Sequence, residues 1–368
     1  AATEAGTHLR APALTGPPPC FEVRLMGHRI SLHLTGSSAA GLVSAARACE
    51  DAGVHSLIAS ELYTNPFVPL AAVAASTSRI GLGTGIALAF VRSPVALALE
   101  ALDLDALTSG RFTLGLGTGV KTLNEQWHGV TNFGPPVPHM REVVAFLRLF
   151  NARCHLGQPI HFEGQFVKVK MDGYQRPTAP QRERIPIHLG ANREKMLELA
   201  GEVADGVLGH VFVSPRQLRD EVLPAIGRGL AKAGRAREDF TLGAGITCAI
   251  DSDRETARHH ARGPLAFYAT VRTYEPLFAA DGFSAEVAAI REAFHGGDKK
   301  RAVTLVTDAM VDTYCAAGTP DDVLRKVAEY DGLLDIKGVS PPRHFCPPDA
   351  HEAYRARILE VFGNPTLG

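Results

Sequence analysis

What this 368-residue sequence lacks excludes several classes of protein. It has no apolar run long enough to cross a membrane. It also has no excess of basic residues, since 38 Lys and Arg stand against 39 Asp and Glu. Broad nucleic-acid binding needs a basic face, so a net charge of −1 argues against that role. We therefore expect neither a membrane nor a nucleic acid as a partner.

Patterns typical of disulfide frameworks and metal sites are also missing. The six cysteines are scattered and form no C-x-x-C pair, so reduced thiols in a cytoplasmic protein are the default expectation. The fifteen histidines include no H-E-x-x-H motif. His259 and His260 are adjacent, so they point to different faces of a helix. The sequence predicts no metal site.

A repeated glycine phrase is the strongest positive feature. An apolar segment runs into G-L-G-T-G at Arg79–Gly85 and again at Arg111–Gly119, and a segment rich in helix formers, Pro94–Leu107, separates the copies. A helical crossover makes the two predicted strands parallel, and ligands bind at the carboxyl ends of such strands. The G-x-G-x-x-G fingerprint fails because Ile86 and Val120 stand at its sixth position. The glycines therefore form either a cofactor floor or tight turns.

Predicted strands and helices alternate along most of the chain. The expected strands cover residues 29–34, 55–60, 79–86, 112–117, 185–190, 206–212, 240–250 and 333–337. This order predicts an α/β fold, a (β/α)8 TIM barrel with a helical insertion between strands 7 and 8 at about 256–314. A doubly wound sheet is the alternative.

The remaining segments complete the expected organisation of the chain. Residues 1–22 are expected to form a flexible N-terminal arm, and residues 23–368 a single domain. Residues 121–138 are long for a simple connection, so we expect an irregular lid or pocket wall there.

Several ordered motifs resemble the luciferase-like monooxygenase superfamily of flavin and deazaflavin enzymes. They are R-I-G-L-G-T-G-I, R-F-T-L-G-L-G-T-G, I-P-I-H-L-G-A-N and L-A-G-E-V-A-D-G-V, in that order. Ser60-Glu61, Asn65-Pro-Phe67 and residues 86–94 are similar to the branch of coenzyme F420-dependent oxidoreductases. The resemblance covers about residues 29–332. It implies a TIM barrel that holds an isoalloxazine-type ring at its carboxyl-terminal mouth.

The resemblance also implies where the cofactor binds. In this family a bulge after strand 3, often with a non-prolyl cis peptide, supports the ring, and Gly85-Ile86 is the matching position. Gly190–Arg193 matches the phosphate loop, where helix N–H groups and one Arg favour an anion, although Asn192 and Arg193 replace the usual glycine pair. The implied cofactor contacts are Ser60, Thr84, Gly85, Ile86, Gly117, Thr118, Gly119, Asn124, Gly190, Ala191, Asn192, Arg193 and His210.

Two residues are candidates for proton transfer. The sugar-phosphate dehydrogenase of this superfamily has Asp-His at the end of strand 2 and a Glu after strand 4. Here Ser60-Glu61 and Val120-Lys121 stand in those places, so sugar-phosphate oxidation is not expected. Glu61 replaces the His, and a carboxyl group at an apolar mouth has a raised pKa and can donate a proton. A structural carboxylate is the alternative. His33, at the end of strand 1, is the second candidate.

The resemblance implies an oxidoreductase that uses coenzyme F420 for hydride transfer to or from a small organic substrate. One alternative is an FMN-dependent monooxygenase that uses O2, and another is a non-catalytic barrel that binds flavin or a different ligand. Hydride transfer is favoured with F420 because a deazaflavin reacts poorly with O2. Two protein partners are possible: a second copy of the chain in a homodimer, and a reductase that supplies reduced flavin or F420.

Overall fold

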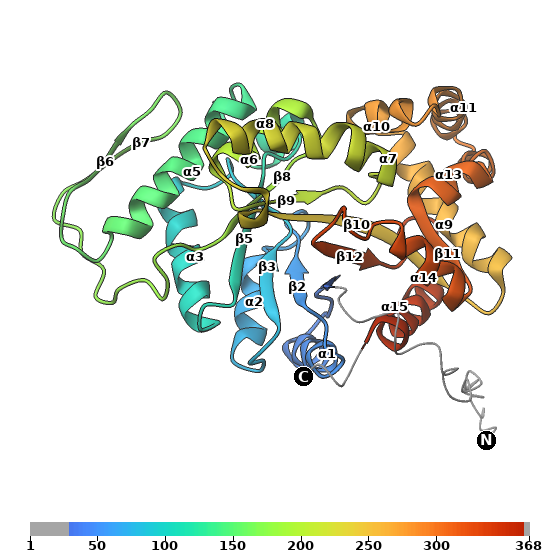
Figure 1. The fold of residues 1–368 in the computed structure, drawn as a ribbon, viewed down its shortest axis with the longest axis horizontal. Helices are drawn as coiled ribbons and strands as arrows, with labels where there is room; N and C mark the ends of the chain where they lie inside the picture. The colour runs from blue at the N-terminus through green and yellow to red at the C-terminus, as the bar shows by residue number, and fades with distance from the viewer. Residues whose placement is uncertain (1–28, 364–368) are drawn as a thin grey trace, which may run out of the picture.

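Eight parallel strands close into a barrel (Figure 1). The computed structural model describes residues 29–363. In spatial order the barrel strands are β1 (Ile30–His33), β2 (Ser56–Ala59), β3 (Gly81–Thr84), β5 (Phe112–Gly117), β8 (Ile187–Gly190), β9 (Gly206–Gly209), β10 (Thr241–Ile250) and β12 (Ile336–Ser340). The pairs β9–β10 and β12–β1 complete the ring. The TIM barrel is thus confirmed, and the doubly wound sheet is excluded because such a sheet has two open edges.

Helices between the strands cover the barrel (Figure 1). They are α1 (Ala39–Asp51), α2 (Phe67–Ala74), α3 (Pro94–Leu107), α4 (Lys121–Trp127), α5 (Pro136–Arg153), α6 (Glu194–Val203), α7 (Pro215–Gln217), the π-helical η1 (Leu218–Val222), α8 (Leu223–Lys232), α14 (Pro320–Ala328) and α15 (Pro348–Phe362). Capping residues and prolines in the sequence mark where these helices begin. Before α3, for example, the Ser93 hydroxyl accepts the Ala96 N–H and Pro94 takes the first helical position.

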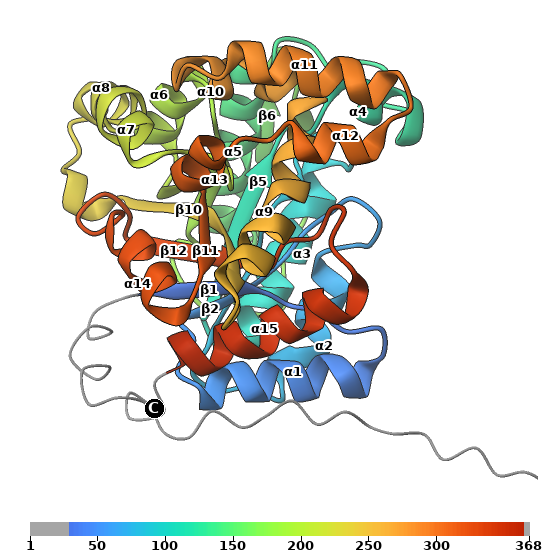
Figure 2. The same ribbon diagram turned by 90° about the vertical axis from the view of Figure 1, so that its right-hand side faces the viewer.

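The predicted helical insertion lies between β10 and β12. It contains α9 (Arg254–Ala269), η3 (Arg272–Tyr274), α10 (Glu275–Ala280), α11 (Ser284–His295), α12 (Lys299–Thr304) and α13 (Asp308–Tyr314). Figure 2 shows α10, α11 and α12 at the opposite end of the molecule from α1 and α15. Phe278, Ile290 and Met310 belong to a second buried apolar cluster, which the insertion shares with Phe212 and Tyr354. The sequence did not predict β11 (Cys315–Gly318), which pairs with the far end of β10.

Two other expectations need correction. The last barrel strand starts at Ile336 rather than at residue 333, because Leu333 and Leu334 donate their N–H groups to Tyr330 O and still belong to a turn. The segment expected to be irregular, 121–138, contains α4 and the start of α5. The structure also contains the short strand β4 (Ala87–Leu88), paired with β5, and a hairpin of β6 (Ile160–Glu163) and β7 (Lys168–Met171), which agrees with the hairpin that the sequence predicts over residues 158–171.

The expected N-terminal arm, residues 1–22, lies outside the described residues. Within residues 29–363 no helix has the length and apolar composition needed to cross a membrane.

Candidate functional site

The barrel brings many of the residues singled out from the sequence to one end. All eight strands run parallel, so their carboxyl ends meet at one rim, which is where TIM barrels place their active sites. His33 ends β1, Ser60 follows β2, Gly85 follows β3, Gly117 ends β5 and Gly190 ends β8. We call this rim the mouth.

The peptide bond between Gly85 and Ile86 is cis, as the resemblance predicted. Three hydrogen bonds tie it to the end of β2. The Gly85 N–H donates to Ala59 O (2.8 Å), the Ser60 hydroxyl donates to Gly85 O (2.6 Å), and the Glu61 N–H donates to Ile86 O (3.0 Å). Ser60 therefore holds the backbone at the position where the family supports the cofactor ring.

Glycines leave room for the Ile86 side chain at the mouth. A Cβ on Gly117 would lie 2.6 Å from Ile86 Cδ1, and a Cβ on Gly190 would lie 3.1 Å from Ile86 Cγ2. A Cβ on Gly85 would lie 2.7 Å from Ile58 Cδ1. Ile86 thus packs directly against the backbone of β5 and β8. The result is an apolar floor without a Cβ at these three glycines, which fits a planar ring.

Two of the predicted cofactor contacts bond to the protein itself. The Thr84 hydroxyl donates to Gly115 O (2.7 Å) and accepts the Gly115 N–H (2.8 Å), and the residue is 1% exposed. Its hydroxyl therefore links two strands and does not reach the mouth. Asn124 is buried, and its amide donates to Thr118 O (2.9 Å) and Val120 O (3.0 Å). Asn124 thus fixes the turn after β5 that contains Gly119.

The Glu61 carboxylate is paired rather than free. It accepts the Leu88 N–H (2.6 Å) and two N–H groups of Arg92 (2.5 and 3.0 Å), and its side chain is 9% exposed. Glu100 lies 3.3 Å from the same guanidinium. Burial raises the pKa of Glu100, the Glu61 charge adds to this, and Arg92 opposes it. This geometry favours the structural role that the sequence left open for Glu61, which anchors the chain just beyond the cis bond.

His33 is exposed at the mouth, and its Nδ1 lies 3.4 Å from Ser60 Oγ. The Ser60 hydroxyl gives its one proton to Gly85 O, so it can only accept from His33 Nδ1–H, which leaves Nε2 as a proton acceptor. Although solvent reaches the ring, surrounding protein atoms desolvate it. This desolvation, helped by the Arg343 charge, lowers the pKa of His33 to about 4. The imidazole is therefore neutral at pH 7.

The phosphate loop predicted at Gly190–Arg193 is tied to the next strand and to the insertion. Asn192 Oδ1 accepts the His210 N–H (3.1 Å), and exposed Arg193 donates to Thr273 O (3.4 Å). The first N–H groups of a helix lack intrahelical partners, and α6 begins directly after Arg193. These groups and the Arg193 charge together suit an anion.

His210 is covered by the insertion. Its ring stacks on Tyr274 with centroids 4.2 Å apart and meets the Tyr268 ring edge-on at 4.8 Å. Burial lowers the pKa of His210 to about 3, and its Nδ1 has no hydrogen-bond partner among the described residues. A neutral ring between two tyrosines does not favour the predicted second contact to a phosphate.

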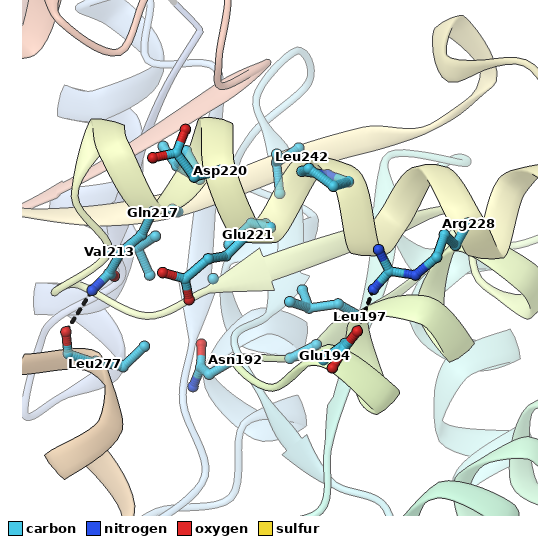
Figure 3. Close-up of a pocket in the computed structure, with 16 residues that line it drawn as sticks. Asn192, Glu194, Leu197, Val213, Gln217, Asp220, Glu221, Arg228, Leu242 and Leu277 are labelled. Atoms are coloured by element: carbon cyan, nitrogen blue, oxygen red, sulfur yellow. Dashed lines mark hydrogen bonds and ion pairs between the residues drawn. The ribbon is translucent and has the colours of Figure 1, made fainter. Parts of the chain in front are cut away.

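A cavity of about 290 Å³ lies behind the phosphate loop, between α6, η1, β9 and β10 (Figure 3). Asn192 lines it together with three carboxylates, Glu194, Asp220 and Glu221. Its arginine, Arg228, pairs with Glu194 at 2.6 Å (Figure 3). The surplus of negative groups disfavours a phosphate in this cavity, so an anion would approach the loop from the mouth.

Two arginines near the mouth were missed by the sequence interpretation. Arg92 lies within the segment quoted for the resemblance, but nothing local shows that it pairs with Glu61, 31 residues away. Arg343 lies three residues beyond the end of β12. A basic residue just after a barrel strand is a usable signal, but placing the strand at 333–337 obscured it.

Known proteins share both sequence and fold with this chain. A family model described as luciferase-like monooxygenase matches residues 21–335. A 5,10-methylenetetrahydromethanopterin reductase of Archaeoglobus fulgidus is 32% identical over 301 residues, 79% of this chain and 87% of that protein. A Mycobacterium tuberculosis protein, named provisionally as a coenzyme F420-dependent oxidoreductase, is 33% identical over 304 residues, 77% of this chain and 85% of that protein.

Solved structures show the same barrel. The coenzyme F420-dependent tetrahydromethanopterin reductase of Methanopyrus kandleri matches with a TM-score of 0.76 and 24% identity, covering 92% of this chain and 97% of that chain. The oxygenating constituent of 3,6-diketocamphane monooxygenase from Pseudomonas putida, in complex with FMN, matches with a TM-score of 0.66 and 19% identity, over 92% and 97%. One fold therefore accompanies two different cofactors.

Proposed function

The chain belongs to the luciferase-like monooxygenase family, and within it we propose that it is a coenzyme F420-dependent oxidoreductase acting on a small organic substrate. One relative supports the choice of cofactor: the M. tuberculosis protein whose provisional name includes F420. The polar groups that suit proton transfer lie at the mouth, beside the cis peptide bond.

The residues at the mouth fit the two ends of F420. Ile86 and the glycines beside it would hold the ring, and Gly190–Arg193 would hold the phosphate. When bound, F420 would supply or accept a hydride, and residues of this chain would move the accompanying proton.

The observation that carries the proposal is the His33 imidazole at the mouth, beside the cis peptide bond. His33 is oriented by Ser60, which is in turn bonded to the carbonyl of Gly85. Its Nε2 would accept the hydroxyl proton of an alcohol substrate during oxidation, and in the reverse direction the protonated ring would return it. His33 is therefore the proposed catalytic residue, and Glu61 the residue that positions the backbone next to it.

An FMN-dependent monooxygenase is the second candidate. The FMN complex from P. putida has the same barrel, and an apolar floor such as that at Ile86 fits any planar ring. Choosing between the two requires measured cofactor affinities.

The test is to titrate F420 and FMN separately into the purified protein and follow the fluorescence of each. We expect F420 to bind with at least about tenfold higher affinity, a difference of about 1.4 kcal/mol. Gly117→Val places side-chain atoms against Ile86 and should weaken F420 binding, whereas Gly227→Ala, at a position with open space, is the matched control. Tighter binding of FMN would contradict the proposal. Tight F420 binding without turnover on a broad panel of alcohols and ketones would favour a non-catalytic barrel.

A further inference from the structure

Arg343 stands at the mouth beside His33. The pairing of β12 with β1 sets Ile30 against Lys337 and Ser31 against Gly338, so the two strands leave the barrel side by side. β1 ends at His33, and Arg343 follows the end of β12 by three residues. The position of the charge agrees with this geometry, because Arg343 contributes to lowering the pKa of His33.

The loop around Arg343 is fixed on both sides. Before it, the Pro342 carbonyl lies 2.9 Å from His351 Nδ1, within hydrogen-bond distance. After it, the His344 ring stacks on Phe267, with centroids 3.7 Å apart and planes at 7°. An anchored loop holds the backbone of Arg343 in place before any ligand arrives, which lowers the entropy lost on binding.

The Arg343 guanidinium has no counter-ion within residues 29–363. The residue is exposed and makes no hydrogen bond or ion pair with the described part of the chain. It influences the pKa values of His33, Tyr268 and His344, and no carboxylate contributes to the shift of any of the three. Arg92, in contrast, is bound by Glu61. An unpaired cation attracts an anion, and a guanidinium binds carboxylate or phosphate through two parallel hydrogen bonds.

The phosphate end of the cofactor is expected elsewhere on the rim. The loop after β8 carries Arg193, and β9 and β10 separate β8 from β12 in the ring. A ligand anion at Arg343 would instead lie next to His33, where the substrate has to react. We propose that Arg343 binds a carboxylate or phosphate group of the substrate, so that the enzyme acts on an anionic small molecule. The substrate assignment rests on the proposed function.

Substrate binding would then also change the pKa of His33. An anion on Arg343 offsets its positive charge, so the pKa of His33 should rise above about 4 when the substrate is present. His33 would become a stronger proton acceptor only in the substrate complex. Ser60 and Arg343 are the polar or charged groups that the structure shows acting on His33.

The first experiment measures anion binding directly in the protein without added cofactor. Benzoate and inorganic phosphate serve as probes, and the titration of His33 is followed by NMR of histidine-labelled protein. We expect either probe to raise the pKa of His33. Arg343→Met should raise it without any probe and should weaken probe binding about 10- to 100-fold, the range for hydrogen bonds to charged groups. Arg272→Met, an exposed arginine of η3, is the control and should change neither. Equal probe affinity in wild type and Arg343→Met, as read from the titration of His33, would overturn the proposal.

The second experiment separates the substrate from the cofactor as the source of the anion. F420 is titrated into wild type and Arg343→Met. Unchanged F420 affinity, together with lost benzoate or phosphate binding, supports a substrate group at Arg343. A similar loss of affinity for F420 would assign Arg343 to the cofactor and overturn the proposal. If F420 does not bind even to wild type, the proposed function fails, while the benzoate and phosphate titrations still decide whether Arg343 binds anions.

Discussion

The two sides of the mouth each present a histidine at the end of a strand, in opposite circumstances. On the β1–β12 side, His33 reaches solvent next to Ser60 and Arg343. On the β8–β9 side, His210 lies against Tyr274, and its backbone N–H is bonded to Asn192. We call these the open side and the covered side.

Burial is the main cause that lowers the pKa of both histidines, to about 4 and about 3. A lowered pKa therefore does not identify a catalytic histidine by itself. What distinguishes His33 is that its ring remains accessible and is oriented by a hydroxyl group. The open side is suited to chemistry on a ligand, and the covered side to holding the backbone of the phosphate loop.

The largest effect should come from removing the base on the open side. His33→Asn should lower turnover about 10²- to 10⁴-fold, because general base catalysis contributes that much. Cofactor affinity should change little. The measurement is steady-state kcat, followed by F420 absorbance, with any substrate that wild type turns over. The matched change on the covered side, His210→Asn, should cost far less turnover. Equal losses in kcat would remove the distinction between the two sides.

The ion pair behind the open side should affect stability more than chemistry. Glu61→Gln leaves Arg92 with one charged partner fewer in a largely buried site, which should cost about 3 kcal/mol of unfolding free energy. Urea denaturation measures it, with Glu100→Gln as a milder control, since the carboxyl group of Glu100 already has a raised pKa. Unchanged stability combined with lost turnover would restore Glu61 as a candidate acid.

Acid should destabilise the fold through His188 on the covered side. Burial lowers the pKa of His188, on β8, from 6.5 to about 4. Below pH 6.5 the unfolded chain binds a proton that the folded chain does not, so stability falls as the pH drops from 6.5 to about 4. Between pH 7 and 5 this one residue accounts for about 2 kcal/mol. His188→Asn should flatten the pH dependence of the urea midpoint. A slope unaffected by His188→Asn would contradict this assignment.

A smaller effect is expected where the insertion covers His210. Tyr274→Ala removes the stacked ring, which should cost about 1 kcal/mol and allow the pKa of His210 to rise. Tyr274→Phe keeps the stack and is the control. Histidine NMR measures the pKa and thermal denaturation the stability. A His210 pKa that stays low in Tyr274→Ala would show that the barrel alone desolvates the ring.

Local signals in the sequence predicted much of this arrangement. The bounds of α3, Pro94–Leu107, follow from a proline at the helix start and a run of helix formers. The cis bond at Gly85 was expected from a family motif. β11 was missed because Cys-Ala-Ala-Gly contains no β-branched or aromatic residue, and its stability comes from pairing with β10.

The sequence could not show which polar groups were already paired. Both Glu61 and His33 were predicted because they lie at the ends of strands. Arg92 pairs with Glu61, whereas His33 has no such charged partner within residues 29–363. Thr84 was similarly predicted to contact the cofactor, but its hydroxyl donates to Gly115 O and accepts the Gly115 N–H. Such choices depend on contacts between residues about 30 positions apart, which no local pattern encodes.

The length of β10 has a consequence for how the molecule unfolds. Its first residues, Thr241–Ala244, pair with β9 in the barrel, and its last, Thr247–Ile250, pair with β11 at the insertion. One continuous strand is therefore shared by the ring and by the helices beyond it. Melting of either part removes hydrogen bonds from the other, so the two should lose structure together. Calorimetry should accordingly record a single cooperative transition rather than an early loss of the insertion.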